Sequence, residues 1–148
     1  MKPIPKPKKS KKLTVTKVQD AVNAAIRRRD GRCMVRDHRH ECAGVLTASH
    51  FFAVGGNSCL RFYPFNIFGQ CFGHHGIHER KHDPVFYHNF MLANYPEELE
   101  WMERNQGKSI KYSQPVLEKI RDYATNDDLD GLRDYIRALF KEYANDAE

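Results

Sequence analysis

The sequence contains no run of apolar residues long enough to cross a membrane, and no apolar segment follows Met1. Without a membrane span or a signal peptide, the expected location is the cytoplasm, where cysteine thiols bind metals more often than they form disulfides. Hydrophobic residues make up only 41% of the 148 residues, so a small core is expected. A small core often depends on a bound metal ion as a staple.

Acidic residues are absent from the first twelve positions, which are rich in lysine and proline. The whole chain has a formal net charge of +5, and its basic excess is concentrated in the first two-thirds. Residues 1–14 offer little to bury, which predicts a disordered basic arm. A basic arm joined to a basic segment is typical of a nucleic-acid binder, although a solubilising tail has the same composition. The side chains expected to contact DNA are Lys6, Lys8, Lys9, Lys11, Lys12, Arg27, Arg28 and Arg29.

The pattern of apolar residues predicts an α+β fold. Two strand-like runs, at 45–54 and 59–62, are separated by a Gly-Gly-Asn turn. Helical periodicity covers 15–29, 72–82, 85–93, 97–105, 114–124 and 128–145. We therefore predict a functional core at 15–94 and a C-terminal helical extension at 95–148 that packs on the core.

Cysteine and histidine are crowded into the central part of the chain, with every histidine between positions 38 and 88. Cys71 and His74 are three positions apart at the entry to a predicted helix, a spacing that lets two soft ligands bind one zinc ion. Two further ligands must come from upstream, and Cys33 is the first of them. The fourth position has three candidates, of which we favour the first: Cys42, His38 and His40. A tetrahedral Zn²⁺ site would tie the start of this helix to the preceding segment.

A second set of residues has the composition that phosphodiester hydrolysis requires. His50 lies in a predicted strand, Asn66 follows sixteen positions later, and His75 lies nine positions further on in a predicted helix. Hydrolysis needs a base that activates water and a cation that stabilises charge on the phosphate and the leaving oxygen. We expect His50 to be the base. His75 would hold Mg²⁺ or Mn²⁺ together with His78, which we favour, or with Glu79. Asn66 is expected to pin the loop that orients His50.

Three stretches of the chain resemble the HNH, or ββα-metal, endonuclease superfamily and, within it, the phage NinG (Rap) recombination proteins. They are AAIRRRDGRC at 24–33, ASHFFAVGGNSCLRF at 48–62 and NIFGQC at 66–71, with a weaker likeness at 97–105 and 111–123. The resemblance implies a small zinc-supported ββα-metal module embedded in mostly helical surroundings. It also implies a structure-selective, metal-dependent endonuclease that cuts branched DNA, of the Holliday-junction or D-loop type, during phage recombination.

The same resemblance assigns roles to single residues. His50 takes the general-base position, and Asn66 takes the position of the HNH asparagine. His74 takes the place of the second ligand in a zinc knuckle, and His75 takes the first helix position of the nuclease site. Arg61 matches an arginine that would grip the scissile phosphate and so contact DNA. The implied cofactors are a structural Zn²⁺ and a catalytic Mg²⁺ or Mn²⁺.

Two positions depart from the pattern of the superfamily. Arg36 stands where the upstream knuckle usually has its second cysteine, and Ser49 stands where many members have an acidic metal ligand. The alternative function is therefore a zinc-stapled DNA-binding module without catalysis. Branched DNA is the expected partner in either case, with phage or host recombination proteins as further partners. A homodimer would suit two matched cuts across a junction, and a phage-encoded chain would act in the host cytoplasm.

Overall fold

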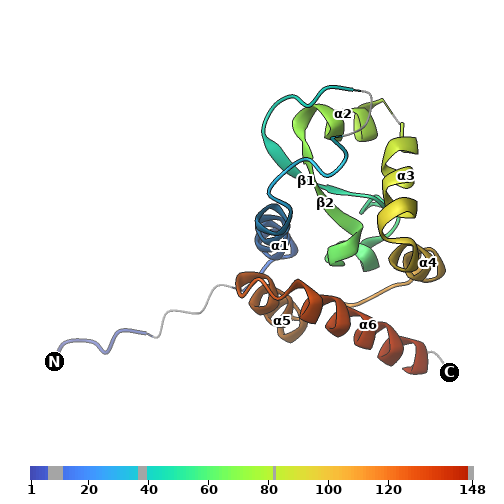
Figure 1. Ribbon diagram of the computed structural model, residues 1–148. Coiled ribbons are helices and arrows are strands. Elements are labelled where there is room, and N and C mark those ends of the chain that lie inside the picture. Colours follow the sequence, from blue (N-terminus) through green and yellow to red (C-terminus); the bar gives the residue numbers. More distant parts are fainter. Residues whose placement is uncertain (7–11, 37–39, 82, 147–148) are drawn as a thin grey trace.

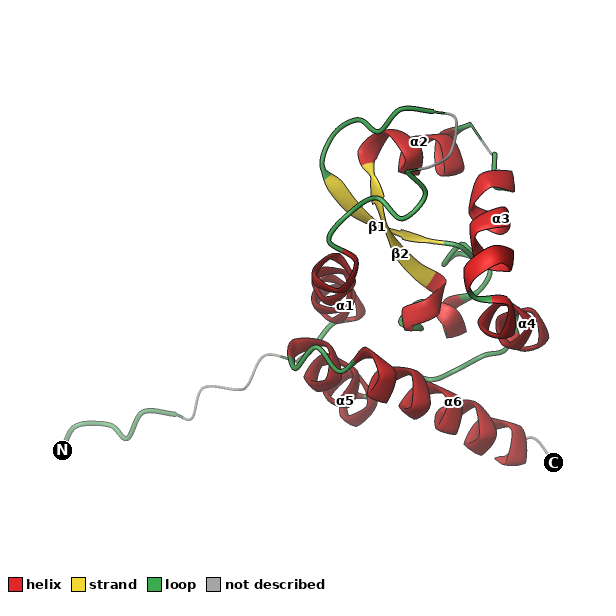
Figure 2. Cartoon of the chain, viewed as in Figure 1, coloured by secondary structure: helices red, strands yellow, loops and turns green. Residues whose placement is uncertain are grey.

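The computed structural model describes residues 1–6, 12–36, 40–81 and 83–146 of the chain. A short two-stranded sheet is surrounded by helices (Figure 1; Figure 2). The elements are, in order, α1 (Val15–Asp30), β1 (Leu46–His50), β2 (Ile67–Cys71), α2 (Phe72–Arg80), α3 (Val85–Asn94), α4 (Pro96–Asn105), α5 (Gln114–Thr125) and α6 (Leu129–Asp146). The predicted α+β class is confirmed, as are the predicted helices to within a residue or two at their ends. None of these described helices is both long and apolar enough to cross a membrane.

The sheet pairs β1 with β2 in antiparallel register, and His50 at the end of β1 lies opposite Ile67 at the start of β2. The connection between the strands contains two short 3₁₀ turns, Ser58–Leu60 and Pro64–Asn66. α2 begins at the residue after β2, so the second strand runs directly into the helix. The order of elements is therefore strand, irregular connection, strand and helix.

The prediction of a strand at 59–62, joined to the first strand by a Gly-Gly-Asn hairpin turn, is wrong. The partner of β1 is β2, and the predicted second strand is half 3₁₀ turn, at Ser58–Leu60, and half ordinary turn, at 61–62. The neighbours Cys59 and Leu60 are both buried, as are the neighbours Phe62 and Tyr63. The segment thus lacks the alternation of inward and outward side chains that a half-exposed strand shows. β1 is also shorter than predicted and ends at His50.

The C-terminal end of α1 is fixed onto β2 by hydrogen bonds to the backbone. The Asp30 carboxylate accepts the Gly69 N–H at 2.7 Å, and Arg29 donates to two carbonyls at the entry to β2. A Cβ atom on Gly69 would lie 3.0 Å from the Arg32 carbonyl oxygen, so this close approach favours glycine. The chain that leaves α1 is thereby held against the sheet.

Tyr63 attaches two of the C-terminal helices to the connection between the strands. The ring of Tyr63 stacks on Trp101 of α4, with the centroids 4.6 Å apart. Its hydroxyl donates to Glu98 of α4 and accepts from Arg137 of α6 at 2.9 Å. Arg137 also donates to Glu98 at 2.8 Å, which closes the network. α4 and α6 therefore share a polar anchor with the part of the chain that leads into β2.

Candidate metal centre and active site

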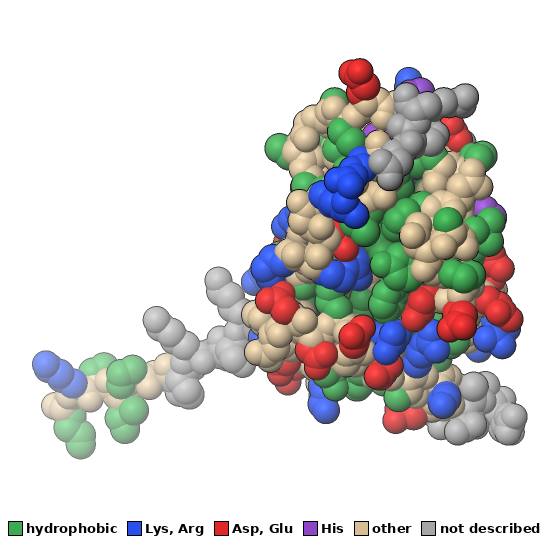
Figure 3. All heavy atoms as spheres, viewed as in Figure 1, with side chains coloured by type: hydrophobic (Ala, Val, Ile, Leu, Met, Phe, Trp, Pro, Cys, Tyr) green, Lys and Arg blue, Asp and Glu red, His purple; other side chains and the backbone are tan. Residues whose placement is uncertain are grey.

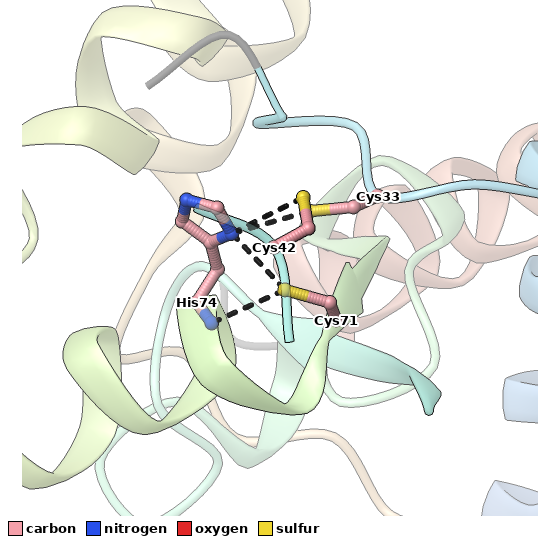
Figure 4. A group of neighbouring side chains, drawn as sticks. All are labelled: Cys33, Cys42, Cys71 and His74. Carbon is pink, nitrogen blue, oxygen red and sulfur yellow. Dashed lines mark hydrogen bonds between the residues drawn. The ribbon is translucent and has the colours of Figure 1, made fainter. Parts of the chain in front are cut away.

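Four side chains from separate segments converge at the start of α2 (Figure 4). Cys71 ends β2, and His74 lies in the first turn of α2. Cys33 and Cys42 come from the segment between α1 and β1. The Nδ1 atom of the histidine lies 3.1 Å from Cys71 Sγ, 3.6 Å from Cys33 Sγ and 3.7 Å from Cys42 Sγ. All four ligand atoms lie within 4.8 Å of one another.

This spacing fits tetrahedral zinc. Zn–S bonds of about 2.3 Å and a Zn–N bond of about 2.0 Å set the nitrogen and each sulfur about 3.6 Å apart, close to two of the three distances. Three thiols and one imidazole are a donor set typical of zinc. The cluster can therefore hold a metal such as zinc, with Cys42 in the fourth position. Of the competing ligands, His40 lines a separate hollow beside α2, and His38 lies outside the described residues.

Backbone N–H groups prepare one of the thiols to bind metal. Burial alone would raise the pKa of the Cys71 thiol, but the N–H groups of His74 and Ala43 donate to its sulfur and lower the pKa to about 6. Burial raises the pKa of Cys33. Desolvation and the neighbouring Cys33 raise the pKa of Cys42 to about 12. The cluster therefore offers one ready thiolate at neutral pH, and a bound metal would displace the protons of the other two.

A second group of residues lines a cavity of about 520 Å³ beside the end of β1 and α2. Its described lining residues are His50, Phe51, Ala53, Val54, His78, Glu79 and Pro84. The fold thus brings the predicted base and two of the predicted cation ligands to one cavity. His75, the remaining ligand, lies one helical turn before Glu79 and hydrogen-bonds to it.

His50 is half-buried and makes a backbone contact that defines its free nitrogen. Its Nε2–H donates to the Arg61 carbonyl at 2.8 Å, which leaves Nδ1 with the available electron pair. Burial lowers the pKa of His50 below 6.5, although the Arg61 carbonyl acts in the opposite direction. The Arg61 guanidinium donates to Gln19 of α1 at 3.3 Å. His50 is therefore a neutral base at neutral pH, and its contact with Arg61 is through the backbone.

His75 lies between a strand hydroxyl and a helix carboxylate. Thr47 of β1 donates its hydroxyl proton to the Gln70 carbonyl at 2.9 Å. The same oxygen lies 2.8 Å from His75 Nδ1, and because its proton is already used it must accept Nδ1–H. The other ring nitrogen, Nε2, lies 2.7 Å from an oxygen of Glu79. Because a carboxylate only accepts, this hydrogen bond requires a proton on Nε2, which a bound cation would replace. The fold thus points the ligand nitrogen of His75 at a carboxylate.

Asn66 is completely buried and pins the loop that follows His50. Its Oδ1 accepts the Phe52 N–H at 2.7 Å, and its amide donates to the carbonyls of Phe52 and Leu60, each at 3.2 Å. Its own carbonyl accepts the Phe51 N–H at 2.8 Å. These bonds join Asn66 to backbone groups of the loop and not to the imidazole of His50.

The cations expected to contact DNA differ in how far the protein itself uses them. Arg29 pairs with Asp30 at 2.7 Å, and its guanidinium also donates to two backbone carbonyls. Arg28 pairs with Asp127 at 2.7 Å on the surface. Arg29 is thus a structural residue, whereas Arg28 keeps an exposed side chain. Of the others, Lys6, Lys12 and Arg27 are exposed, and Lys8, Lys9 and Lys11 lie outside the described residues.

Both clusters lie within a stretch that matches a known protein family. A family model described as the bacteriophage lambda NinG protein matches residues 5–133. The chain belongs to the NinG family. Comparisons with curated proteins and with solved structures found no match.

In this NinG-family protein the residue before His50 in β1 is not among the described residues that line the cavity. Ser49 is completely buried, and its carbonyl accepts the Tyr87 hydroxyl at 2.6 Å. Among the described lining residues, the carboxylate comes from Glu79 on the helix. Sequence analysis missed the contact of Thr47 with His75. The sequence does place Thr47 in a predicted strand. Only the pairing of this strand with β2, which leads into α2, shows that Thr47 contacts His75.

Proposed function

We propose that this NinG-family protein is a metal-dependent DNA endonuclease of the HNH type. The observation that carries the proposal is the cavity beside β1 and α2. A half-buried His50 with a lowered pKa lines this cavity together with Glu79, which hydrogen-bonds to His75 one helical turn earlier in α2. A base and a set of cation ligands are the two components that phosphodiester hydrolysis requires.

Each group has a defined part in the proposed reaction. His50 takes a proton from water at Nδ1, because Nε2 already donates to the Arg61 carbonyl. Asn66 keeps the loop after His50 in place through its bonds to backbone groups. When bound, Mg²⁺ or Mn²⁺ supplies Lewis-acid stabilisation of charge on the phosphate and on the departing 3′ oxygen. The Arg61 guanidinium, now held by Gln19, would turn to the phosphate when DNA binds.

The residues present favour a cation held by His75 and Glu79. A carboxylate oxygen is the ligand that Mg²⁺ prefers, and Glu79 supplies one next to His75 Nε2. His78 also lines the cavity, but its ring packs edge-on against Tyr87 at 5.1 Å and its Nδ1 atom is buried. Glu79 is therefore a better second ligand than His78, which we had favoured from the sequence.

The cluster of Cys33, Cys42, Cys71 and His74 has a structural part in this proposal. Four protein ligands fill the tetrahedral positions of zinc and leave none open for water or substrate. The bound metal would join the segment after α1 to the junction of β2 and α2. It would thereby hold the helix that carries His75 and Glu79 in place.

Membership of the NinG family suggests a recombination-related phage protein. We extend this to branched recombination intermediates as the DNA that is cut. The lysine-rich arm would add affinity that depends on salt and not on base sequence.

The deciding experiment is cleavage of a labelled four-way junction and of a matched linear duplex, with Mg²⁺ or Mn²⁺. It compares the zinc-loaded wild type with His50→Ala, and with His40→Ala as a control at an exposed histidine. Cutting by the wild type and the control, with loss in His50→Ala, would support the proposal. If all three bind the junction and retain zinc but none cuts, the protein is a zinc-stapled DNA-binding module. The absence of an acid at Ser49 favours that second function.

A further inference from the structure

A second cavity, of about 400 Å³, is lined by a different face of α3. Arg32 and Val35 from the segment after α1 form one wall, and Phe86, Asn89 and Phe90 of α3 form the other. Figure 3 shows hydrophobic side chains open to solvent between these two walls, with Lys or Arg side chains at the edge. The size and the mixture of aromatic and polar groups are typical of a small ligand site.

The wall from α3 presents an aromatic ring whose position is fixed. Phe90 is half-buried and packs edge-on against Phe68 of β2, with ring centroids 5.1 Å apart. Phe86 beside it is almost completely buried. Phe90 can therefore offer a flat apolar surface to a planar ligand without first losing side-chain freedom.

The polar groups of the cavity suit an anion that carries a hydrogen-bonding ring. Arg32 is exposed and positively charged, and none of the described lining residues is acidic. The amide of Asn89 is exposed beside the aromatic wall and can both donate and accept. These groups together match one nucleotide. The guanidinium can bind its phosphate, the amide can bind the edge of its base, and the ring of Phe90 can stack on the base.

The metal cluster connects the two walls. Arg32 directly precedes the metal ligand Cys33, and the ring of Phe86 lies 5.9 Å from that of the ligand His74. Metal at the cluster would thus set the spacing between the two walls.

We propose that this cavity binds one unpaired nucleotide of a branched DNA. This inference rests on the proposed function, because it takes DNA as the substrate. The face of a base in a continuous duplex is covered by its neighbours, whereas an unpaired base at a branch can enter a concave site and stack. A second face of α3 contacts the His50 cavity, since Tyr87 and His88 pack against Phe51. Binding of an unpaired base in this cavity would therefore place the branch of the DNA near the His50 cavity, where the bond is cut.

The test measures binding by fluorescence anisotropy, with the full zinc-loaded chain and no added Mg²⁺ or Mn²⁺, so that cleavage plays no part. The probes are labelled oligothymidylate, a duplex of the same length and free thymidine monophosphate as a competitor. The variants are Arg32→Gln with Asn89→Ala, and Phe90→Leu, which keeps an apolar side chain but removes the ring. The matched control is Arg104→Gln with Gln106→Ala, at exposed positions near the end of α4.

We expect both test variants to bind the single strand roughly tenfold more weakly, with little change for the duplex and no change in the control. Equal losses on the single strand and the duplex would overturn the proposal, because Arg32 would then be a general phosphate contact. Unchanged binding of the single strand would overturn it as well. Competition by free nucleotide as strong as that by the strand would assign the cavity to mononucleotides instead. None of these outcomes depends on cleavage, so a failure of the nuclease proposal would be seen separately.

Discussion

Thr47 Oγ1 and His75 Nδ1 lie 2.8 Å apart, and this contact decides which nitrogen of His75 is available to a cation. With Nδ1–H donated to Thr47, the ligand atom is Nε2, once a cation has replaced the proton that Nε2 donates to a Glu79 oxygen at 2.7 Å. Neighbouring ligands of an octahedral ion with bonds of about 2.1 Å lie about 3 Å apart. A small increase in the distance between His75 Nε2 and the Glu79 oxygen would therefore make room for the ion. The hydroxyl of Thr47 holds the His75 ring in the orientation that this site needs.

Replacing Thr47 by valine removes the acceptor for His75 Nδ1–H and keeps the shape of the side chain. We expect the Mg²⁺ concentration for half-maximal cleavage to rise at least tenfold, with a smaller change in the rate at saturating Mg²⁺, because the ring loses its fixed orientation. Thr47→Ser keeps the hydroxyl and should restore the wild-type requirement. Equal loss in both variants would indicate a packing role for Thr47 instead.

Glu79→Gln tests whether the helix supplies the missing carboxylate. The amide is a weaker ligand for a hard cation, so we expect roughly tenfold weaker Mg²⁺ binding and a relative preference for Mn²⁺, which tolerates nitrogen ligands better. Calorimetric titration of the zinc-loaded protein with each ion gives the affinities without reliance on cleavage. Glu103→Gln, at an exposed glutamate of α4, is the control. Unaltered Mg²⁺ binding in Glu79→Gln would mean that Glu79 is not a cation ligand and that its contact with His75 is only a surface interaction within the helix.

Loss of a ligand from the metal cluster should reduce stability. At a free zinc concentration about a thousandfold above Kd, binding stabilises the folded chain by about 4 kcal/mol, so Cys42→Ala should lower Tm by roughly 10 °C. Cys42 is exposed, which limits the loss of packing in this variant. Cys59→Ala, at a cysteine outside the cluster, should retain zinc in elemental analysis. Wild-type zinc content in Cys42→Ala would exclude Cys42 as a ligand.

Local spacing explains why the metal cluster could be predicted from the sequence. Cys71 and His74 flank a strand-to-helix junction, where a separation of three residues already places both ligand atoms on one side. Cys33 was the first upstream ligand predicted, and Cys42 was favoured for the fourth position over His38 and His40. A tetrahedral zinc ion needs four such donors, and this requirement limits the residues that can be its ligands.

The strand pairing could not be predicted in the same way. β2 is buried at every position and contains Gly69 and Gln70, so it lacks both alternation and typical strand composition. Its pairing with β1 crosses a long irregular connection, and no short turn specifies the register. Every contact that depends on that register, such as that of Thr47 with His75, was therefore inaccessible. The cavity on α3 depends on the same tertiary packing.

Deleting residues 1–12 should weaken DNA binding far more than turnover. The segment carries six lysines and no acid, and each phosphate contact adds close to one unit to the slope of log affinity against log salt. Anisotropy at several KCl concentrations should therefore show a shallower slope for the truncated chain. Replacing the six lysines by glutamine should have the same effect while the length is kept. An equal loss of turnover at saturating DNA would contradict this role for the arm.

The pH profile of cleavage tests His50 as the base. Burial lowers the pKa of its imidazole below 6.5, so the neutral form that accepts a proton persists to more acidic pH than in an exposed histidine. The acid limb of the rate at saturating cation should thus have its midpoint below pH 6.5. Zinc content must be measured at each pH, because protonation of the thiolate ligands would also abolish activity. A midpoint above pH 6.5 with zinc retained would mean that a group other than His50 takes the proton.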